Sequence, residues 1–339
     1  MSNKYISIEA VDPEKSESRY LSILESLKVK KLIALTIEVT SKCNLSCSYC
    51  GMHNDKSKHV KHRKEIGSME LDKFTEIITK CRGAHQIDVL YLHGMGEPLL
   101  HPNLVEFISI AKKAGIAGRI VVITNGIKLN WEMLNKLIGS GLDEVRISYD
   151  VFDEQCYTEI KGANLSLVVR TNIEECLHKL KEKKINVRFH IDCKKWIYGN
   201  YHLNEQSEKV ILHFEKLVSD VDNASIRLAN EFDWNSQAGI NGTTYKRSTP
   251  CEGAFYNLLI HSDGEITPCC LDITKELSIG NIHFYENIDE VLASTRLLEI
   301  RTKLLSNNFQ GIESCRQCNV TSCVDKLLQD RRNEILPLL

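Results

Sequence analysis

The sequence predicts an α/β fold: a partial (β/α)6 TIM-like barrel followed by a small C-terminal α+β domain. From residue 31 to about residue 229, short runs of β-forming residues alternate with stretches of helical periodicity, which is typical of parallel βα units. Six such repeats predict an open barrel. Beyond residue 250 the pattern changes to a hairpin and a helix, and 339 residues are enough for one barrel and a small appended domain.

The predicted elements follow in order along the chain. Six runs predict the barrel strands: residues 32–39, 87–93, 119–124, 144–149, 185–192 and 225–228. Between them, apolar side chains recur with helical spacing: Phe74, Ile77, Ile78 and Cys81, then Leu104, Phe107, Ile108 and Ala111, and later Ile173, Cys176, Leu177 and Leu180. Cys81 and Cys176 are therefore expected in the core. Residues 254–260 and 265–269 predict a hairpin around a Ser-Asp-Gly turn, and residues 288–305 predict a helix.

These elements divide the chain into four segments. We expect an N-terminal extension at 1–30, the barrel at 31–235, the C-terminal domain at 236–328 and a tail at 329–339. Residues 230–250 are rich in Asn, Gly, Ser and Thr, which favours a linker or an active-site loop.

The composition is that of a soluble globular protein, with 42% hydrophobic and 26% charged residues. A formal charge of −2 gives no general attraction to nucleic acid or anionic membranes, so neither is expected as a partner. The sequence shows neither a signal peptide nor an apolar run of membrane-spanning length, which predicts a cytoplasmic protein. In that reducing compartment, closely spaced members of its 13 cysteines are better explained as metal ligands than as disulfides.

Cys43, Cys47 and Cys50 follow the first predicted strand with the spacing CX3CX2C. A structural zinc site, or a 4Fe-4S cluster bound entirely by protein, takes four protein ligands. Three ligands leave one iron open to a substrate or cofactor. The spacing therefore predicts a reactive cluster, and the alternative is three loop thiols that share no metal.

Polar residues follow the next three predicted strands. In Gly94-Met95-Gly96-Glu97-Pro98, the glycines would let the backbone approach a ligand, and Glu97 can accept a hydrogen bond from an ammonium group. Asn125 closes the third strand and Ser148 the fourth. Ordinary turn and helix-cap chemistry is the alternative explanation. Since barrels of this kind carry their chemistry at the C-terminal ends of the strands, these residues are expected beside the cysteine loop.

The fifth predicted strand carries Arg188, His190 and Asp192 at alternating positions, so that all three could face the barrel interior. His190, Asp192 and the neighbouring Cys193 are candidate catalytic residues, although satisfied polar groups in the core would give the same pattern. Three further candidates for substrate contact lie in the following segment: Glu231, Trp234 and Asn235.

A second cysteine set lies in the C-terminal third. Cys251, Gly264 and Cys269 have the spacing CX12GX4C, and Cys315 and Cys318 form CX2C. These four thiolates are a complete set for another 4Fe-4S cluster, and zinc would accept the same ligands. A fully ligated cluster has no open iron, which predicts an electron conduit. Cys323 follows without the further cysteines that a second auxiliary cluster would need.

The roles of the remaining cysteines and of one basic run stay open. Cys156, Cys193 or Cys270 could donate a hydrogen atom to a substrate radical if it faced the active site. The basic run at residues 56–64 is either a solvated loop or a docking surface for an acidic flavodoxin or ferredoxin.

The cysteine loop, with Tyr49 before its last cysteine, resembles the signature of the radical S-adenosylmethionine (SAM) enzymes. In that family the amino and carboxylate groups of SAM chelate the open iron, and the residue at the position of Tyr49 packs near the adenine. Gly94, Gly96 and Glu97 resemble the Gly-Gly-Glu element that holds the amino group, although Met95 separates the glycines here. The resemblance places Ser148 at the ribose hydroxyls and Asn125 at the carboxylate or ribose.

The C-terminal cysteines resemble the twitch domain, a shortened SPASM domain. The resemblance implies two 4Fe-4S clusters, one binding SAM and one auxiliary, with flavodoxin or ferredoxin as electron donor. It also implies that SAM is cleaved to methionine and a 5′-deoxyadenosyl radical. The likeness is strongest to twitch-bearing dehydrogenases that oxidise an aminocyclitol, so we expect a radical SAM oxidoreductase acting on a sugar or aminocyclitol. Hydrogen return from a thiol would give epimerisation instead.

Two other functions are kept as alternatives. A peptide-modifying maturase is less favoured, because many such enzymes carry a recognition domain before the barrel and only about 30 residues precede the first predicted strand here. A separate recognition protein could replace that domain. A non-catalytic iron-sulfur or zinc protein is the more distant alternative.

Overall fold

The computed structural model describes residues 6–8, 13–54, 67–196, 201–230 and 246–339. The described strands form one ten-stranded sheet in the order β1-β7-β6-β5-β4-β3-β2-β8-β9-β10. Neighbouring strands are parallel from β1 through β8, while the β8–β9 and β9–β10 pairs are antiparallel. The strands are β1 (Ile6–Ile8), β2 (Ala34–Ile37), β3 (Ile87–Leu92), β4 (Ala117–Thr124), β5 (Glu144–Ser148), β6 (Arg188–Lys195), β7 (Ala224–Asn230), β8 (Asn257–Ile260), β9 (Glu265–Thr267) and β10 (Gly280–Asn281).

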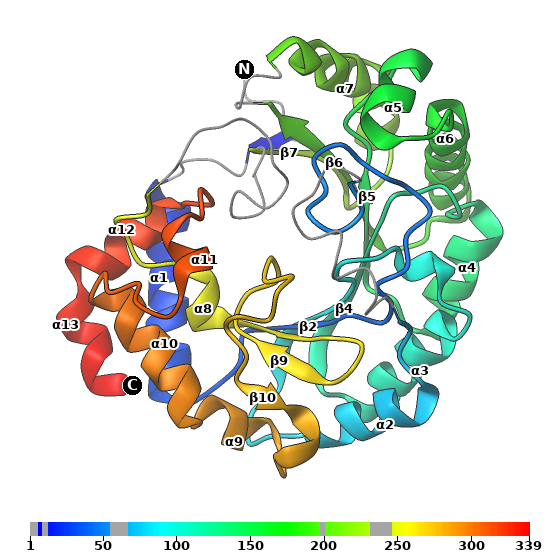
Figure 1. The fold of residues 1–339 in the computed structure, drawn as a ribbon. Helices are drawn as coiled ribbons and strands as arrows, with labels where there is room; N and C mark the ends of the chain where they lie inside the picture. The colour runs from blue at the N-terminus through cyan, green and yellow to red at the C-terminus, as the bar shows by residue number, and fades with distance from the viewer. Residues whose placement is uncertain (1–5, 9–12, 55–66, 197–200, 231–245) are drawn as a thin grey trace.

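Strands β2 to β7 are six consecutive parallel strands that curve into an open barrel, which confirms the predicted partial (β/α)6 fold (Figure 1). An outer layer of helices covers this half: α2 (Leu71–Lys80), α3 (Leu104–Ala114), α4 (Trp131–Ser140), α5 (Glu154–Lys161), α6 (Ser166–Lys183) and α7 (Asn204–Ser219). The other helices are α1 (Pro13–Lys28), α8 (Gly253–Tyr256), α9 (Ile288–Leu292), α10 (Thr295–Leu305), α11 (Glu313–Arg316), α12 (Cys323–Asp330) and α13 (Arg332–Ile335). Four short 3-10 turns complete the described elements: η2 (Pro98–Leu100), η3 (Tyr201–Leu203), η5 (Ile282–Phe284) and η6 (Leu336–Leu338).

The predicted helical faces form the main core. Phe74, Ile77 and Ile78 of α2 are buried against the sheet, and the stacked rings of Phe74 and Phe107 lie 4.1 Å apart and join α2 to α3. All four residues of β2 are buried, because β2 is covered on both faces. Cys81 and Cys176 are buried in this core, as predicted.

Two predicted elements of the C-terminal half are wrong in detail. Residues 254–260 are not one strand, because helix α8 comes first and β8 begins only at Asn257. The predicted helix at 288–305 is two helices, α9 and α10, separated where Ser294 adopts an extended backbone at the start of α10. In both places the apolar residues continue through the break, so periodicity alone does not reveal it.

The N-terminal segment contributes to both halves of the molecule. β1 pairs with β7 and so extends the barrel sheet. Tyr20, Ile23 and Leu27 of α1 belong instead to a second core with Phe255, Ile300 and other residues of the C-terminal half. Helix α1 therefore packs against the C-terminal helices α8, α12 and α13 (Figure 1).

Some predicted features fall outside the described residues. These are the basic run at residues 56–64 and the candidate contacts Glu231, Trp234 and Asn235. Among the described helices, none combines the length and the apolar character that crossing a membrane would require.

Candidate active site

The three N-terminal cysteines lie in the loop that leaves the C-terminal end of β2. All three are free and partly exposed, and the backbone N–H of Cys50 donates to the carbonyl oxygen of Cys47 at 2.9 Å. Burial, with smaller contributions from the nearby Glu97, Cys47 and Cys50, raises the pKa of the Cys43 thiol to about 12. The three sulfurs thus lie close enough to sense one another, and binding a metal here would release their protons.

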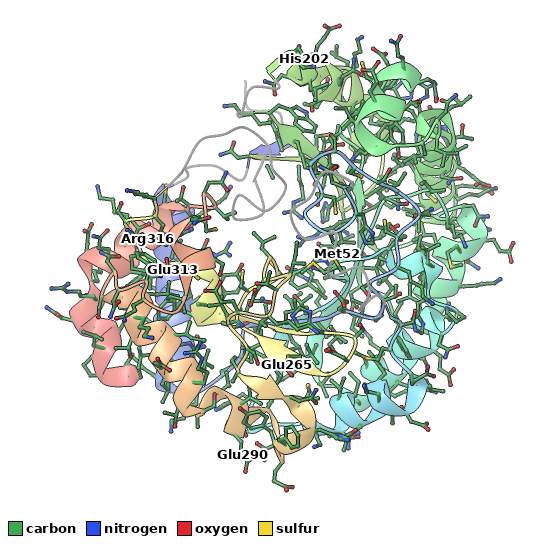
Figure 2. The ribbon with its side chains drawn as sticks, viewed as in Figure 1. Met52, His202, Glu265, Glu290, Glu313 and Arg316 are labelled. Carbon is green, nitrogen blue, oxygen red and sulfur yellow. The ribbon has the colours of Figure 1, made fainter. Side chains whose placement is uncertain are left out.

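The end of the loop packs against the C-terminal half. Met52, labelled in Figure 2, forms a small core with Met95, Leu259 and Ile273, and Cys50 packs against this core. His53 donates its backbone N–H to the Cys50 sulfur at 3.3 Å, and its ring nitrogen Nε2 lies 3.0 Å from the carbonyl oxygen of Met95. The cysteine loop is therefore held both by the apolar contacts of Met52 and by the hydrogen bonds of His53.

Gly96 packs against the protein's own backbone, and Gly94 packs against a side chain. A Cβ atom on Gly96 would lie 2.4 Å from the carbonyl oxygens of both Thr40 and Lys42, and one on Gly94 would lie 2.6 Å from Cγ of Glu38. The sequence predicts that these glycines admit a ligand. The close approach in the structure is instead to the segment that carries the cysteines, and contact with SAM stays a prediction.

Glu97 joins the ends of β3 and β4. Its buried carboxylate accepts hydrogen bonds from the Thr124 hydroxyl at 2.6 Å and from the backbone N–H groups of Asn125 at 2.7 Å and Leu99 at 3.0 Å. Burial raises the pKa of Glu97, and these hydrogen bonds partly offset that effect. The Asn125 side chain donates to Asn44 at 2.8 Å, so Glu97 and Asn125 both lie beside the cysteine loop.

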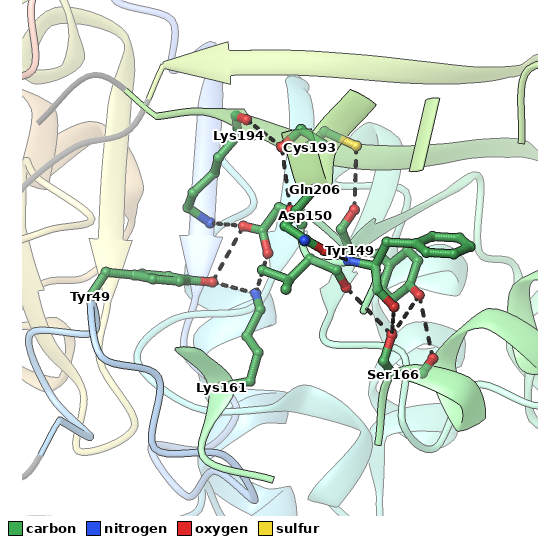
Figure 3. A network of polar contacts seen from close by, with 11 residues as sticks. Tyr49, Tyr149, Asp150, Lys161, Ser166, Cys193, Lys194 and Gln206 are labelled. Carbon is green, nitrogen blue, oxygen red and sulfur yellow. Dashed lines mark hydrogen bonds and ion pairs between the residues drawn. The ribbon is translucent and has the colours of Figure 1, made fainter. Parts of the chain in front are cut away.

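A buried charge network adjoins Tyr49 (Figure 3). Asp150 follows Ser148 at the end of β5, and its carboxylate pairs with Lys161 at 2.6 Å and with Lys194 at 2.7 Å. Lys161 also donates to the Tyr49 hydroxyl. Burial disfavours a charged carboxylate, but the two ammonium groups outweigh it and hold the pKa of Asp150 well below its usual range.

The Tyr49 ring is contacted by Lys194 and Trp196. The ammonium group of Lys194 lies 4.2 Å from the ring centroid, and the Trp196 ring meets it edge-on at 5.6 Å. Contact of Tyr49 with adenine stays a prediction. Sequence reasoning missed Lys161, Lys194 and Trp196, since nothing in their local pattern separates them from ordinary charged and core residues.

The inner face of the barrel is polar along β5 and β6. Strand register sets Glu144 opposite Arg188, Arg146 opposite His190 and Ser148 opposite Asp192. His190 Nδ1 lies 2.8 Å from the Ser225 hydroxyl, and burial lowers the pKa of His190. The predicted alternation of Arg188, His190 and Asp192 on one face therefore holds.

On this face, Asp192 has a pKa that is strongly raised for a carboxyl group. Burial raises the pKa of Asp192 to about 7, against the opposing effects of Arg146 and Lys194. Its Oδ1 atom lies 3.6 Å from a guanidinium nitrogen of Arg227. A carboxyl group with this pKa can both accept and release a proton near neutral pH.

Two of the three candidate hydrogen-donating cysteines lie away from the barrel interior. Cys193 is on the helix-facing side of β6, 1% exposed, and donates to the carbonyl oxygen of Tyr149 at 3.3 Å. Its position between Asp192 and Lys194 turns it to the opposite face, so the structure does not support it as a catalytic residue. Cys156 lies on α5, in the outer helical layer.

A cavity of about 320 Å³ lies between the barrel and the C-terminal half. One wall comes from the barrel and includes Thr36, Tyr91, His93, Ile123 and Arg146. The opposite wall comes from the C-terminal half and carries the four predicted ligands together with one more thiol: Cys251, Cys269, Cys315, Cys318 and Cys270. The structure thus gathers the second cysteine set, and it places Cys270 at the same cavity.

His93 and Arg146 in this cavity were missed by sequence reasoning. Burial and the adjacent Arg146 lower the pKa of His93 to about 4, so its imidazole is neutral at pH 7. Arg146 pairs with Glu144 and stacks over Tyr91 with its guanidinium carbon 5.3 Å from the ring centroid. The available signal was the position of His93 directly after β3 and of Arg146 on the inner face of β5, and using it requires the register of the sheet.

The donor sets fit iron-sulfur clusters by their chemistry. Within the described residues, no three His, Cys, Asp or Glu side chains are arranged as ligands of a single metal ion. A 4Fe-4S cluster binds each thiolate through a different iron, so its ligands surround the cluster and need not converge on one point. Three thiols in one loop leave a fourth position open, and four thiols around one cavity complete a set.

The comparisons with known proteins agree with this arrangement. Residues 37–213 match the radical SAM superfamily, and residues 251–319 match the SPASM iron-sulfur cluster-binding domain. The fold resembles the solved structure of BtrN in complex with AdoMet and 2-DOIA, with a TM-score of 0.56 and 17% identity over 86% of this chain and 94% of that one. It also resembles native anSMEcpe with bound AdoMet, with a TM-score of 0.56 and 14% identity over 90% of this chain and 96% of that one.

Curated relatives match in sequence over shorter stretches. A tungsten-containing aldehyde ferredoxin oxidoreductase cofactor-modifying protein of Pyrococcus furiosus is 34% identical over 117 residues, which are 34% of this chain and 30% of that protein. A probable GTP 3′,8-cyclase of Methanococcus aeolicus is 34% identical over 168 residues, 48% of this chain and 52% of that protein. The chain thus spans about half or less of the length of these relatives. A GTP 3′,8-cyclase of Alkaliphilus oremlandii is 27% identical over 307 residues, 81% of this chain and 92% of that protein.

The family match covers more than half of the chain, and it includes the cysteine loop at the C-terminal end of β2. The chain therefore belongs to the radical SAM superfamily and carries a C-terminal SPASM iron-sulfur cluster-binding domain.

Proposed function

We propose that the protein is a radical SAM oxidoreductase that removes a hydrogen atom from a C–H bond of a sugar or aminocyclitol and oxidises the adjoining alcohol. One observation carries the proposal. The cavity has inward-facing residues of the barrel on one side and Cys251, Cys269, Cys315 and Cys318 on the other, so a substrate bound there would contact the barrel interior and lie beside the proposed electron acceptor. The auxiliary cluster would take up part of this cavity of about 320 Å³, and the space left for a substrate favours a small molecule.

The residues divide into three sets. Cys43, Cys47 and Cys50 would hold the first cluster, and Cys251, Cys269, Cys315 and Cys318 the auxiliary cluster. The proposed SAM contacts are Tyr49, Gly94, Gly96, Glu97, Asn125 and Ser148. The clusters supply the one-electron chemistry, and the protein supplies binding, orientation and exclusion of water.

The overall reaction balances without an added oxidant. SAM and a secondary alcohol give methionine, 5′-deoxyadenosine, a ketone and one proton. SAM cleavage takes up one electron, and oxidation of the substrate radical releases one electron together with the proton. Asp192 is the proposed proton acceptor, since its carboxyl group titrates near neutral pH on the inner face of the barrel.

Epimerisation is the alternative outcome at the same site. Cys270 lines the cavity, unlike Cys193 and Cys156, and a thiol there could return a hydrogen atom to the substrate radical. Incubation in deuterated water distinguishes the outcomes, because only epimerisation places solvent deuterium on the substrate carbon.

The test follows 5′-deoxyadenosine in anaerobically reconstituted protein with dithionite. Wild-type protein should cleave SAM, and Cys50→Ser should abolish cleavage. Cys269→Ser should still cleave SAM without substrate but should not form ketone. SAM cleavage by Cys50→Ser would contradict the assignment of the site, and ketone formation by Cys269→Ser would contradict the role of the second cysteine set.

Two other substrate classes are supported by specific relatives. The fold resembles Streptococcus suis SuiB bound to its precursor peptide SuiA, with a TM-score of 0.52 and 14% identity, and a PqqA peptide cyclase of Gluconobacter oxydans is 28% identical over 131 residues. Peptide modification is therefore the first alternative, and a nucleotide substrate is raised by the GTP 3′,8-cyclases. Product formation from a panel of aminocyclitols, precursor peptides and GTP separates the three.

The remaining proposals concern the cell. A flavodoxin or ferredoxin would supply the electron for SAM cleavage, in the cytoplasm, without nucleic acid or membrane as partner. The formal charge of −2 supports the last point, since it provides no general attraction to polyanions.

A further inference from the structure

Arg247 is a buried cation among the C-terminal cysteines. Its side chain is 0% exposed, and its Nη2 atom lies 3.8 Å from the sulfur of Cys318. Its Nη1 atom donates to the carbonyl oxygen of Pro250 at 2.6 Å and to the carboxylate of Asp325 at 3.0 Å. One guanidinium therefore contacts a predicted ligand, the residue before another ligand and a carboxylate.

These contacts tie together ligand segments that are far apart in the sequence. The backbone N–H of Arg247 donates to the carbonyl oxygen of Arg316 at 2.8 Å, between Cys315 and Cys318. Asp325 accepts the backbone N–H of Glu252 at 2.7 Å, next to Cys251. Arg247 and Asp325 thus bridge the first and last parts of the cysteine set before any metal is bound.

Arg247 is the positive member of a buried ion pair beside the sulfur of Cys318, and the Asp325 side chain that pairs with it is only 3% exposed. Within the described residues, Nε of Arg247 is buried without a hydrogen-bond partner, and such an unsatisfied donor by itself destabilises the folded state.

The reduction potential of an iron-sulfur cluster depends on its net charge, on hydrogen bonds to its sulfurs and on its exposure. Arg247 acts on all three, because it brings a permanent positive charge and an N–H donor to a sulfur in a buried place. A positive charge stabilises the state that has gained an electron, and the carboxylate of Asp325 opposes it.

We propose that Arg247 is a positioning residue that raises the reduction potential of the auxiliary cluster, so that the cluster accepts the electron released by the substrate radical, and that Asp325 limits this effect. The inference rests on the proposed function, because it requires the C-terminal cysteines to hold an iron-sulfur cluster. The electron is the one released with the proton when the substrate radical becomes a ketone, so no further oxidant is needed.

The test uses the full chain with Cys43→Ala, Cys47→Ala and Cys50→Ala, so that only the C-terminal site can be loaded with iron and sulfide. Redox titration followed by electron paramagnetic resonance gives the potential. Arg247→Met should lower the equilibrium constant for one-electron reduction at least tenfold, which is about 59 mV. Arg247→Lys should retain part of the effect, because it keeps the charge and loses the planar donor geometry.

A substitution of Asp325 tests the opposite change in charge. Asp325→Asn keeps an oxygen acceptor for its neighbours and removes the opposing charge, so the potential should rise. The matched control is Arg316→Met: Arg316 lies on the same cysteine segment, with 53% of its side chain exposed (Figure 2), and its loss should leave the potential unchanged.

The possible results separate the inference from the proposed function. If the triple variant takes up zinc or no iron, the proposed auxiliary cluster is wrong. If it binds a cluster whose potential moves in the same direction in Arg247→Met and Asp325→Asn, or in neither, Arg247 has only a structural role and the inference is overturned. If Arg247→Met does not hold iron, Asp325→Asn and Arg247→Lys decide, and unchanged potentials in both overturn it.

Discussion

The ammonium group of Lys161 lies 2.6 Å from the carboxylate of Asp150, and the two side chains are only 2% and 0% exposed. The same ammonium group donates to the hydroxyl of Tyr49, in the loop that carries the N-terminal cysteines. This ion pair therefore fixes the cysteine loop to the ends of β5 and α5 (Figure 3). Since both charged groups are removed from water, each is stabilised by the opposite charge of the other.

Lys161→Met should destabilise the protein by about 3 kcal/mol, at the lower end of the cost of breaking a buried ion pair, because Lys194 still pairs with Asp150. The urea midpoint of the metal-free protein measures the effect. Lys209→Met is the control, because its ion pair with Asp153 is 37% and 42% exposed and should contribute less than about 1 kcal/mol. Equal effects of the two substitutions would contradict the importance given to the buried pair.

Asp192 should make stability depend on pH. The pKa of Asp192 is about 7 in the folded protein and 3.8 without the fold's influence, so the folded state holds a proton more tightly. The resulting penalty is absent below about pH 4, develops as the pH rises and is complete above pH 7. Asp192→Asn should therefore stabilise the metal-free protein at pH 8 relative to wild type and lose this advantage at pH 4.

Thermal unfolding of both proteins between pH 4 and pH 8 measures that difference. The matched control is Asp153→Asn, on an exposed carboxyl group whose pKa the hydrogen bonds from Lys209 and Gln206 lower. Its effect should have the opposite sign, because a lowered pKa stabilises the fold above about pH 4. A constant difference between Asp192→Asn and wild type across the range would show that Asp192 titrates normally.

Gly96→Ala should destabilise the protein by about 1–3 kcal/mol, because the new methyl group would overlap the carbonyl oxygens of Thr40 and Lys42 and backbone must move. The displaced segment leads into Cys43, so iron uptake by the N-terminal site should fall as well. Denaturant unfolding and iron content measure the two effects.

Gly139→Ala is the control for that substitution. Gly139 lies in α4 with nothing within 4 Å of an added Cβ, so alanine there should stabilise the protein by about 0.5–1 kcal/mol through helix propensity. If Gly96→Ala were as well tolerated as Gly139→Ala, the tight packing between the glycine turn and the cysteine loop would be wrong.

The parts predicted from the sequence are those set by local pattern. The strand at Glu144–Ser148 and the apolar face of Phe74, Ile77 and Ile78 appear where periodicity places them. Helix α8 was missed because its four residues continue an apolar run into β8. Cys193 was an open candidate because strand alternation gives two faces, and only the packed sheet shows which face is inside.

The sequence by itself determined the chemistry, since CX3CX2C and the four later cysteines specify their donor atoms without any fold. Only the tertiary structure decided the neighbours of those donors. Arg247 and Asp325 meet across 78 positions, and Lys161 and Tyr49 across 112. The charges and hydrogen bonds that act on a buried thiolate come from the segments that pack against it. These segments are far apart in the sequence, so a local sequence pattern does not show that they meet.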